Sequence, residues 1–267
     1  MVDRICEITD YVKKQKPLIH CITNPISINQ CANTILAAGA KPVMAEHPGE
    51  VCEITESADS LMLNLGNITD ARMNSMRISA NKANEKEIPV ILDAVGIACS
   101  GLRRQYIKDI LSKASMTVIK GNYSEICALH NEQYFFAGVD AEDALNRENV
   151  KETAVNLAKK YNAVILATGK TDVITDGENT IYVNNGCREL TYVTGTGCML
   201  GSLCASFLAV SEPMDAIVSA CVYFGICGQL AVTDKGTATF MVNLTDKLST
   251  LIRDEISELL DIEENII

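Results

Sequence analysis

Apolar residues along this chain follow two patterns that alternate from one end to the other. Residues 28–36 carry apolar side chains at spacings of three and four, which predicts an amphipathic helix that ends at Gly39. Leu61–Leu65 and Pro89–Asp93 are instead short, nearly continuous apolar runs, as in strands that are buried on both faces. The alternation predicts repeated strand–helix units.

The same patterns extend over the whole chain. Strands are predicted at residues 18–22, 42–45, 61–65, 89–93, 116–119 and 163–169, with helices between them. Asp172–Thr175 and Thr180–Val183 predict a hairpin that turns at Asp176-Gly177, and the chain beyond residue 201 is expected to be helical. This order predicts an α/β fold, with a central, mostly parallel sheet covered by helices on both faces. Residues 1–267 contain no linker or internal repeat, so a single domain is expected.

The amino-acid composition limits the possible binding partners and the cellular compartment of the protein. A formal charge of −11 argues against nucleic acid or an anionic membrane as the main partner. The eleven cysteines are scattered without a C-x-x-C pair, which is typical of reduced core residues in a cytoplasmic protein and leaves little for a zinc site. The N-terminus has no apolar signal core, and Ala216–Val232 carries enough small and polar residues to be read as a buried helix.

A glycine-threonine loop stands directly before an apolar helix near residue 200. Residues 193–201 read Val-Thr-Gly-Thr-Gly-Cys-Met-Leu-Gly. Unpaired backbone N–H groups at a helix start favour an anion, phosphate above all, and Gly195 and Gly197 allow close approach of the backbone. Cys198 falls in the first turn, where the helix field is expected to lower a thiol pKa. The stretch is equally compatible with a plain turn before a core helix.

Neither of two common nucleotide-binding loops fits the chain. The third glycine comes one residue too late for a dinucleotide-binding G-x-G-x-x-G pattern, and Val164 stands where a P-loop ending at Gly169-Lys170-Thr171 needs glycine. Polar residues and glycines nevertheless follow strand after strand, at the edge where parallel α/β sheets bind ligands. They are Asn24, Met44, Gly66-Asn67, Asp93, Lys120-Gly121-Asn122, Thr168-Gly169 and Gly195–Cys198.

Together these residues match the needs of phosphoryl transfer, which requires a cradle for phosphate, carboxylates for Mg²⁺ and a cation on the polyphosphate. The loop Gly195–Cys198 can be the cradle. Asp93 and Glu125 can hold the metal, and Lys120 can supply the cation. Cys198 can act as a weak base on an acceptor alcohol.

Several longer sequence motifs show which protein family this chain resembles. Residues 20–33 read His-Cys-Ile-Thr-Asn-Pro-Ile-Ser-Ile-Asn-Gln-Cys-Ala-Asn and continue to Leu-Ala-Ala-Gly-Ala-Lys-Pro-Val-Met at residue 44. With Leu-Gly-Asn at 65–67, Asp-Ala-Val-Gly at 93–96, Gly-Asn-Tyr-Ser-Glu at 121–125 and the loop at 193–198, this chain resembles hydroxyethylthiazole kinase over roughly residues 15 to 245. The resemblance implies a ribokinase-like fold and phosphorylation of 4-methyl-5-(2-hydroxyethyl)thiazole for thiamine synthesis. ATP and Mg²⁺ are the implied cosubstrate and cofactor.

The resemblance also implies roles for single residues. Asn24, Met44 and Gly195 would contact the thiazole. Lys120 and Thr168 would contact ATP. The pair Asn122 and Glu125 would organise Mg²⁺ and phosphate beside Asp93, and the run that includes Gly197 would form an anion hole with Cys198 in the slot of the usual base aspartate. A homotrimer is implied, and we expect its acceptor pockets to combine the Asn24–Met44 region of one subunit with Gly195–Cys198 of a neighbour.

Two departures from the family pattern and two alternatives accompany this hypothesis. Lys120 replaces a commoner arginine, which keeps the charge and loses the bidentate fork, and Ala94 replaces a commoner proline. One alternative is a related dehydratase that acts on a damaged nicotinamide nucleotide, against which the N-terminal motif and Cys198 weigh. The other is a nucleotide-binding sensor without catalysis, which the missing base aspartate suggests.

Overall fold

Nine strands form one sheet in the computed structural model, which describes residues 1–131 and 146–266. The order across the sheet is β2-β1-β3-β4-β5-β6-β7-β8-β9. Strands from β2 through β6 pair in parallel, whereas β7, β8 and β9 add antiparallel to one edge. The strands are β1 (Leu18–Ile22), β2 (Lys41–Val43), β3 (Ser60–Asn64), β4 (Val90–Asp93), β5 (Val118–Asn122), β6 (Val164–Thr168), β7 (Asp172–Thr175), β8 (Asn179–Val183) and β9 (Ile262–Ile266).

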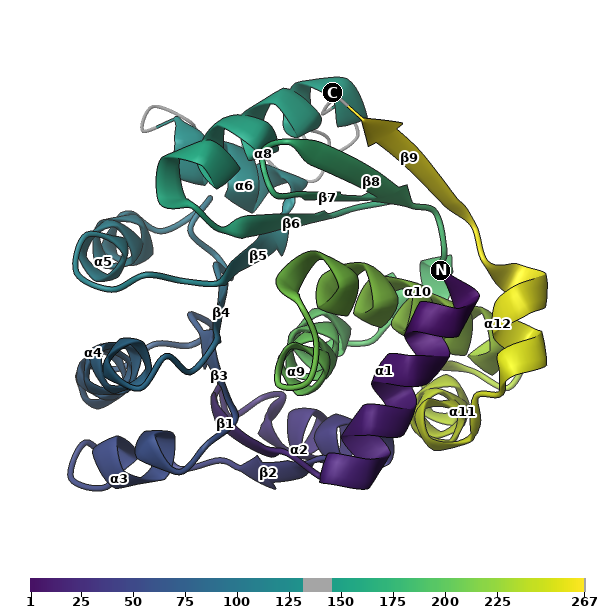
Figure 1. The fold of residues 1–267 in the computed structure, drawn as a ribbon, viewed down its shortest axis with the longest axis horizontal. Helices are drawn as coiled ribbons and strands as arrows, with labels where there is room; N and C mark the ends of the chain where they lie inside the picture. Colours follow the sequence, from purple (N-terminus) through teal and green to yellow (C-terminus); the bar gives the residue numbers. More distant parts are fainter. Residues whose placement is uncertain (132–145, 267) are drawn as a thin grey trace.

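Helices cover both faces of this sheet, as the sequence predicted (Figure 1). The first face carries α3 (Val51–Glu56), α4 (Asp70–Glu85), α5 (Gly101–Leu111), α6 (Tyr123–His130) and α8 (Arg147–Tyr161). The other face carries α1 (Val2–Gln15), α2 (Ile28–Ala38), α9 (Thr196–Leu208), α10 (Pro213–Ala231), α11 (Thr237–Thr250) and α12 (Arg253–Leu259). A short 3-10 helix, η1 (Arg188–Tyr192), precedes α9. The predicted mostly parallel α/β architecture is confirmed.

Alternation along the central strands divides the core into two layers. In β3, the side chains of Leu61 and Leu63 join the layer under α4 and α5, while Met62 between them joins the layer under α9. All three are fully buried, which explains why the strand reads as a continuous apolar run rather than an alternating one.

Most predicted elements are present, with shifted ends. Thr69 caps α4 by accepting the backbone N–H of Arg72 at 3.2 Å, and Gly39 ends α2 with a φ of 97°. The helix expected before Ser57 is limited to α3 because Pro48-Gly49 turns the chain first. Of the helices expected up to Tyr161, the part at 132–145 lies outside the described residues.

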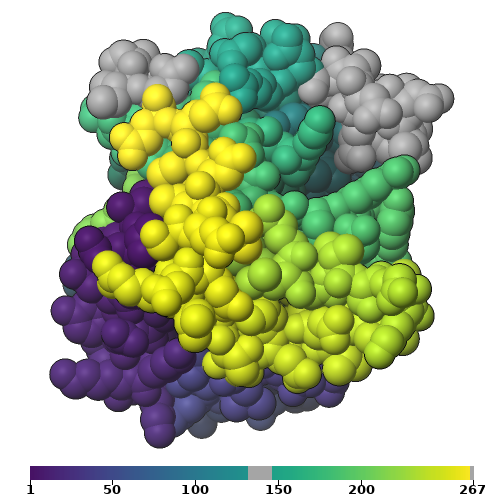
Figure 2. All heavy atoms as spheres, turned by 90° about the vertical axis from the view of Figure 1, so that its right-hand side faces the viewer, coloured from purple at the N-terminus to yellow at the C-terminus, as the bar shows by residue number. Residues whose placement is uncertain are grey.

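The C-terminal region corrects the prediction that everything after residue 201 is helical. After α12, residues 262–266 form β9 and extend the sheet by pairing antiparallel with β8. Helix α12, yellow like the rest of the C-terminal segment in Figure 2, lies beside the purple N-terminal helix α1, and an ion pair between Arg253 and Asp3 joins the two. Because β9 reads Ile-Glu-Glu-Asn-Ile and has no apolar–polar alternation, its strand character depends on its partner.

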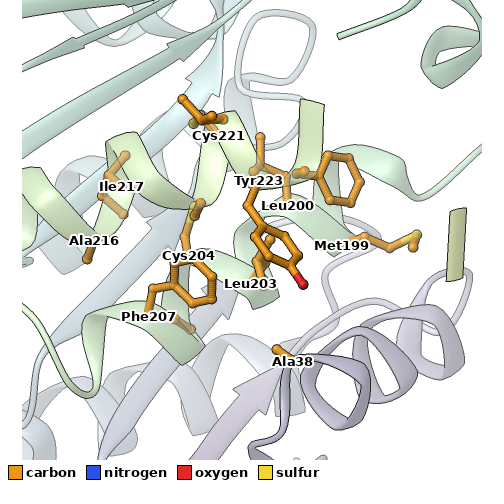
Figure 3. Close-up of a cluster of buried hydrophobic side chains, with 14 of the residues drawn as sticks. Ala38, Met199, Leu200, Leu203, Cys204, Phe207, Ala216, Ile217, Cys221 and Tyr223 are labelled. Atoms are coloured by element: carbon orange, nitrogen blue, oxygen red, sulfur yellow. The ribbon is translucent and has the colours of Figure 1, made fainter. Parts of the chain in front are cut away.

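The helix that follows the glycine-threonine loop is anchored deeply in the core. Met199, Leu203 and Phe207 of α9 point into the apolar layer that α10 closes (Figure 3). The rings of Phe207 and Tyr223 meet edge to face, with centroids 5.8 Å apart. α10 is long and apolar enough to cross a membrane, but 78% of that window is buried inside the protein, so it is a core helix as predicted. The buried body of α9 fixes the position of its N-terminus.

Candidate functional site

A cleft of about 440 Å³ opens at the carboxyl ends of the parallel strands, where ligands of such sheets bind. Nine of the ten residues that the sequence indicated for the site line this cleft; Met44 is the exception. The lining consists of Asn24, Ile26, Ser27, Gly66, Asn67, Asp93, Val95, Arg103, Lys120, Asn122, Glu125, Thr168, Thr194, Gly195, Gly197 and Cys198.

The N-terminus of α9 forms one wall of the cleft. Gly195 caps the helix with a φ of 92°, a conformation that side chains disfavour, and a Cβ there would lie 3.2 Å from that of Ser27. Gly197 has no such crowding, because a Cβ would meet only the Lys120 ammonium, 3.8 Å away. The first backbone N–H groups of a helix have no acceptor inside it, so α9 presents its donors and its positive dipole end to the cleft.

Opposite this helix start lies a buried ion pair. The Nζ of Lys120 is 3.1 Å from Oδ2 of Asp93, and the two residues are 3% and 1% exposed. Burial raises the pKa of Asp93, which Lys120 partly offsets. Burial alone would lower the pKa of Lys120, but the Asp93 charge holds it above its ordinary value, so the cation persists across neutral pH. The other carboxylate oxygen, Oδ1, is buried and accepts no hydrogen bond from the described residues.

Asn122 and Glu125 form a capping box at the start of α6. The side chain of Asn122 accepts the backbone N–H of Glu125 at 2.8 Å, and Oε2 of Glu125 accepts that of Asn122 at 2.7 Å. Oε1 of Glu125 accepts the N–H of Gly96 at 2.6 Å and so fixes the loop after β4. Burial raises the pKa of Glu125, and the nearby Asp93 charge adds to the shift. Each oxygen therefore already holds one backbone donor.

Cys198 lies in the first turn of α9, with its sulfur facing two amide side chains. Nδ2 of Asn24 donates to Sγ at 3.4 Å, and Nδ2 of Asn64 does so at 3.3 Å. Burial raises the pKa of the thiol, and the charge of Asp93 raises it further. The expectation of a lowered thiol pKa is therefore wrong, because burial outweighs the favourable helix end.

Two placements differ from what the sequence indicated. Asn24 and Cys198 touch within one chain, so the expectation that these two residues come from different subunits is wrong. The cause is the packing of α2 directly against α9. Met44 is partly buried in the loop after β2 and does not reach the cleft of its own chain. Thr168 does line it, at the end of β6, with its hydroxyl donating to the Gly121 carbonyl at 3.4 Å.

Two cleft-side residues escaped the sequence analysis. Arg103 on α5 extends its guanidinium over Gly96 and donates to the Val95 carbonyl at 3.2 Å, and it pairs with no carboxylate among the described residues. Asn64, at the end of β3, contacts several site residues at once. In the sequence, Arg103 looks like any surface cation of an amphipathic helix. Asn64 lies inside an apolar run. Neither residue therefore stood out in the sequence as a site residue.

Comparisons with known proteins all point to the same protein family. Residues 9–254 match the profile of the hydroxyethylthiazole kinase family. Hydroxyethylthiazole kinase 2 of Clostridium botulinum is 47% identical over 255 residues, which cover 94% of this chain and 96% of the relative.

Solved structures agree with this. A hydroxyethylthiazole kinase protein from Pyrococcus horikoshii superposes with a TM-score of 0.90 at 35% identity, covering 98% of this chain and 99% of its own. A ribokinase-like superfamily protein from Enterococcus faecalis, with a TM-score of 0.67 at 16% identity over 96% and 95% of the two chains, shares the fold.

Proposed function

This chain belongs to the hydroxyethylthiazole kinase family, and we propose that its cleft transfers a phosphoryl group from Mg²⁺-bound ATP to the hydroxyl of 4-methyl-5-(2-hydroxyethyl)thiazole. Thiazole phosphate from this reaction enters thiamine biosynthesis. A kinase of small molecules in that pathway, with all eleven cysteines as free thiols, fits the cytoplasm.

One arrangement carries the proposal: the α9 N-terminus, the Lys120 ammonium and the Asp93 carboxylate all line one cleft. Phosphoryl transfer depends mainly on positioning and charge stabilisation, and this wall supplies backbone donors and a cation for the polyphosphate. Arg103 adds a planar fork suited to phosphate oxygens, which Lys120 lacks. The alternatives, a dehydratase and a catalytically silent sensor, lack the support that the family match gives the kinase.

An ATP-consumption assay tests this function directly. We expect ATP turnover that requires both Mg²⁺ and the thiazole alcohol. Turnover that instead requires a hydrated nicotinamide nucleotide would establish the dehydratase, and ATP binding without turnover would establish the sensor.

The residues of the cleft fit a magnesium ion. Asp93 Oδ1 is a buried acceptor without a partner among the described residues, and Mg²⁺ favours one or two carboxylates plus waters and phosphates. We assign Asp93 as a ligand and Glu125, whose oxygens are held by backbone N–H groups, as a contact through water. When bound, the ion would neutralise charge on the polyphosphate. Asn122 and Thr168 would keep the nucleotide against the ends of β5 and β6.

We predict that Cys198 is a replaceable base. Cys198→Ala should retain measurable activity, because a base contributes only about 10²–10⁴-fold and the loose transition state needs it late. Cys198→Asp should match or exceed the parent, since Asn24 and Asn64 already point N–H donors at this position.

The pH dependence of kcat checks the role of Cys198. Because burial raises its thiol pKa, the parent holds mostly thiol at neutrality, so its rate should climb with rising pH, whereas that of Cys198→Asp should be flatter. Initial rates at saturating substrates measure this. Complete inactivity of both variants, with intact folding by circular dichroism, would contradict a base role.

We also propose that the chain forms a homotrimer whose neighbours complete the acceptor pocket. Large apolar side chains are exposed on elements that contact one another: Leu36 on α2, Val242 on α11 and Tyr192 on η1, each more than half exposed. Large exposed apolar side chains on adjoining elements are typical of protein interfaces. In this arrangement Met44 reaches the thiazole of a neighbouring subunit, since it does not line its own cleft.

Leu36→Glu should dissociate the trimer and lower activity, because it buries a charge in the proposed interface. Light scattering coupled to gel filtration gives the mass, and activity is measured on the separated species. Leu102→Glu is the control, since Leu102, on α5 of the opposite helix layer, is 61% exposed and Leu36 is 56% exposed. A fully active monomer would refute the trimer.

A further inference from the structure

Asn64 forms hydrogen bonds to several residues around the cleft, and none of the roles described above accounts for them. It ends β3, is fully buried, and uses every hydrogen-bonding position of its amide. Oδ1 accepts the backbone N–H of Gly66 at 2.8 Å and Nδ2 of Asn24 at 3.1 Å. Nδ2 donates to Oδ2 of Asp93 at 3.0 Å and to Sγ of Cys198 at 3.3 Å.

Backbone donors fix which way both amides face. The N–H of Gly66 can only donate, so the atom of Asn64 that meets it must be the oxygen, and the NH₂ group must face the sulfur. Asn24 is oriented in the same way, because its Oδ1 accepts the N–H groups of Ile26 and Ser27 at 3.1 and 3.2 Å. Two amide NH₂ groups therefore converge on Cys198.

The lack of a side chain at Gly66 is also needed for this arrangement of the two amides. A Cβ there would lie 2.8 Å from Oδ1 of Asn64 and equally close to Nδ2 of Asn24. Such contacts are too short, so the turn after β3 needs glycine in order to bring its N–H against the amide.

We infer that Asn64 is a positioning residue: it holds the Cys198 sulfur as a hydrogen-bond acceptor and fixes its place relative to Asp93. The amide has two N–H groups and divides them between the carboxylate and the sulfur. A donor at the sulfur stabilises the thiolate against burial. This inference rests on the proposed role of Cys198 as the base, and it assigns the residue that prepares that base.

The test is the rate at which iodoacetamide alkylates Cys198 in the ligand-free protein at pH 8, followed by peptide mass spectrometry. Asn64→Asp keeps the acceptor for Gly66 and Asn24 but turns the NH₂ into an oxygen, which does not donate to sulfur even when it shares a proton with Asp93. Asn64→Leu removes the donor without adding an acceptor. In either variant we expect Cys198 alkylation to slow by about tenfold, since each pKa unit is a factor of ten in thiolate.

The sign of the change separates positioning from a merely structural role. Loosened packing exposes a thiol and speeds alkylation, whereas loss of the donor slows it. The exposed Cys99 gives an internal reference that should not change, and Asn33→Asp on the surface of α2 is the matched control. Unchanged or faster alkylation of Cys198 in whichever variant folds, as judged by circular dichroism, overturns the inference. The alkylation test involves no turnover, so its outcome does not depend on whether the kinase assay succeeds.

Discussion

Replacing Gly197 by valine should abolish phosphoryl transfer and leave the protein at least as stable as before. Gly197 is the second residue of α9, and the space where its side chain would lie meets only the Lys120 ammonium at 3.8 Å. Valine would fill the gap between the helix start and this cation, where the polyphosphate must enter. Since each donor to the developing charge is worth about 10²–10³-fold, we expect kcat/KM for ATP to fall by about 10³-fold or more.

Stability should move the other way. Glycine is the poorest helix former after proline, so valine should add a few tenths of a kcal/mol to the free energy of unfolding. Thermal unfolding and initial rates together measure both effects. Gly101→Val is the matched control: Gly101 begins α5, and no atom lies within 4 Å of its Cβ position. Near-normal ATP kinetics in Gly197→Val would rule out the α9 N-terminus as the phosphate cradle.

Asp93→Asn should remove both activity and stability. The change deletes the proposed metal ligand, and we expect turnover to fall by at least about a hundredfold and the half-saturating Mg²⁺ concentration to rise. It also leaves the buried Lys120 without its partner, which typically costs about 3–5 kcal/mol. Chemical denaturation measures the stability, and a magnesium titration of the initial rate measures the metal requirement.

A double variant separates the two effects. In Asp93→Asn with Lys120→Met, the uncompensated buried charge is gone, so stability should recover toward that of the parent while activity stays lost. Stability that is unchanged in the single variant would show that the ion pair contributes nothing to folding. Activity within a few-fold of the parent would return Asp93 to a structural role.

The sheet and most of the cleft follow from local sequence. Parallel strands buried on both faces leave continuous apolar runs, and the polar residues just after them must gather at one edge, so Asn24, Asp93 and Lys120 could be grouped without a structure. Their relation across the cleft could not. That Asp93 and Lys120 neutralise each other depends on the register that places β4 beside β5.

The parts that escaped prediction are contacts between distant segments. Asn64 interrupts an apolar run and acquires its role only when β1, β4 and α9 meet around it. The raised thiol pKa of Cys198 likewise reflects burial by those segments, whereas the local pattern revealed only the helix end. The strand β9 was missed because a brief acidic segment has little strand character until β8 supplies a partner.

The pairing of β9 with β8 also bears on how the protein is made. A ribosome delivers β8 well before β9, and α9, α10, α11 and α12 must emerge in between. During that interval the hairpin exposes an open edge of unpaired backbone groups, which can recruit another nascent chain. The sheet is therefore completed only near the end of synthesis. Termination of translation before Ile262 would release a chain in which the edge of β8 stays unpaired and prone to aggregation.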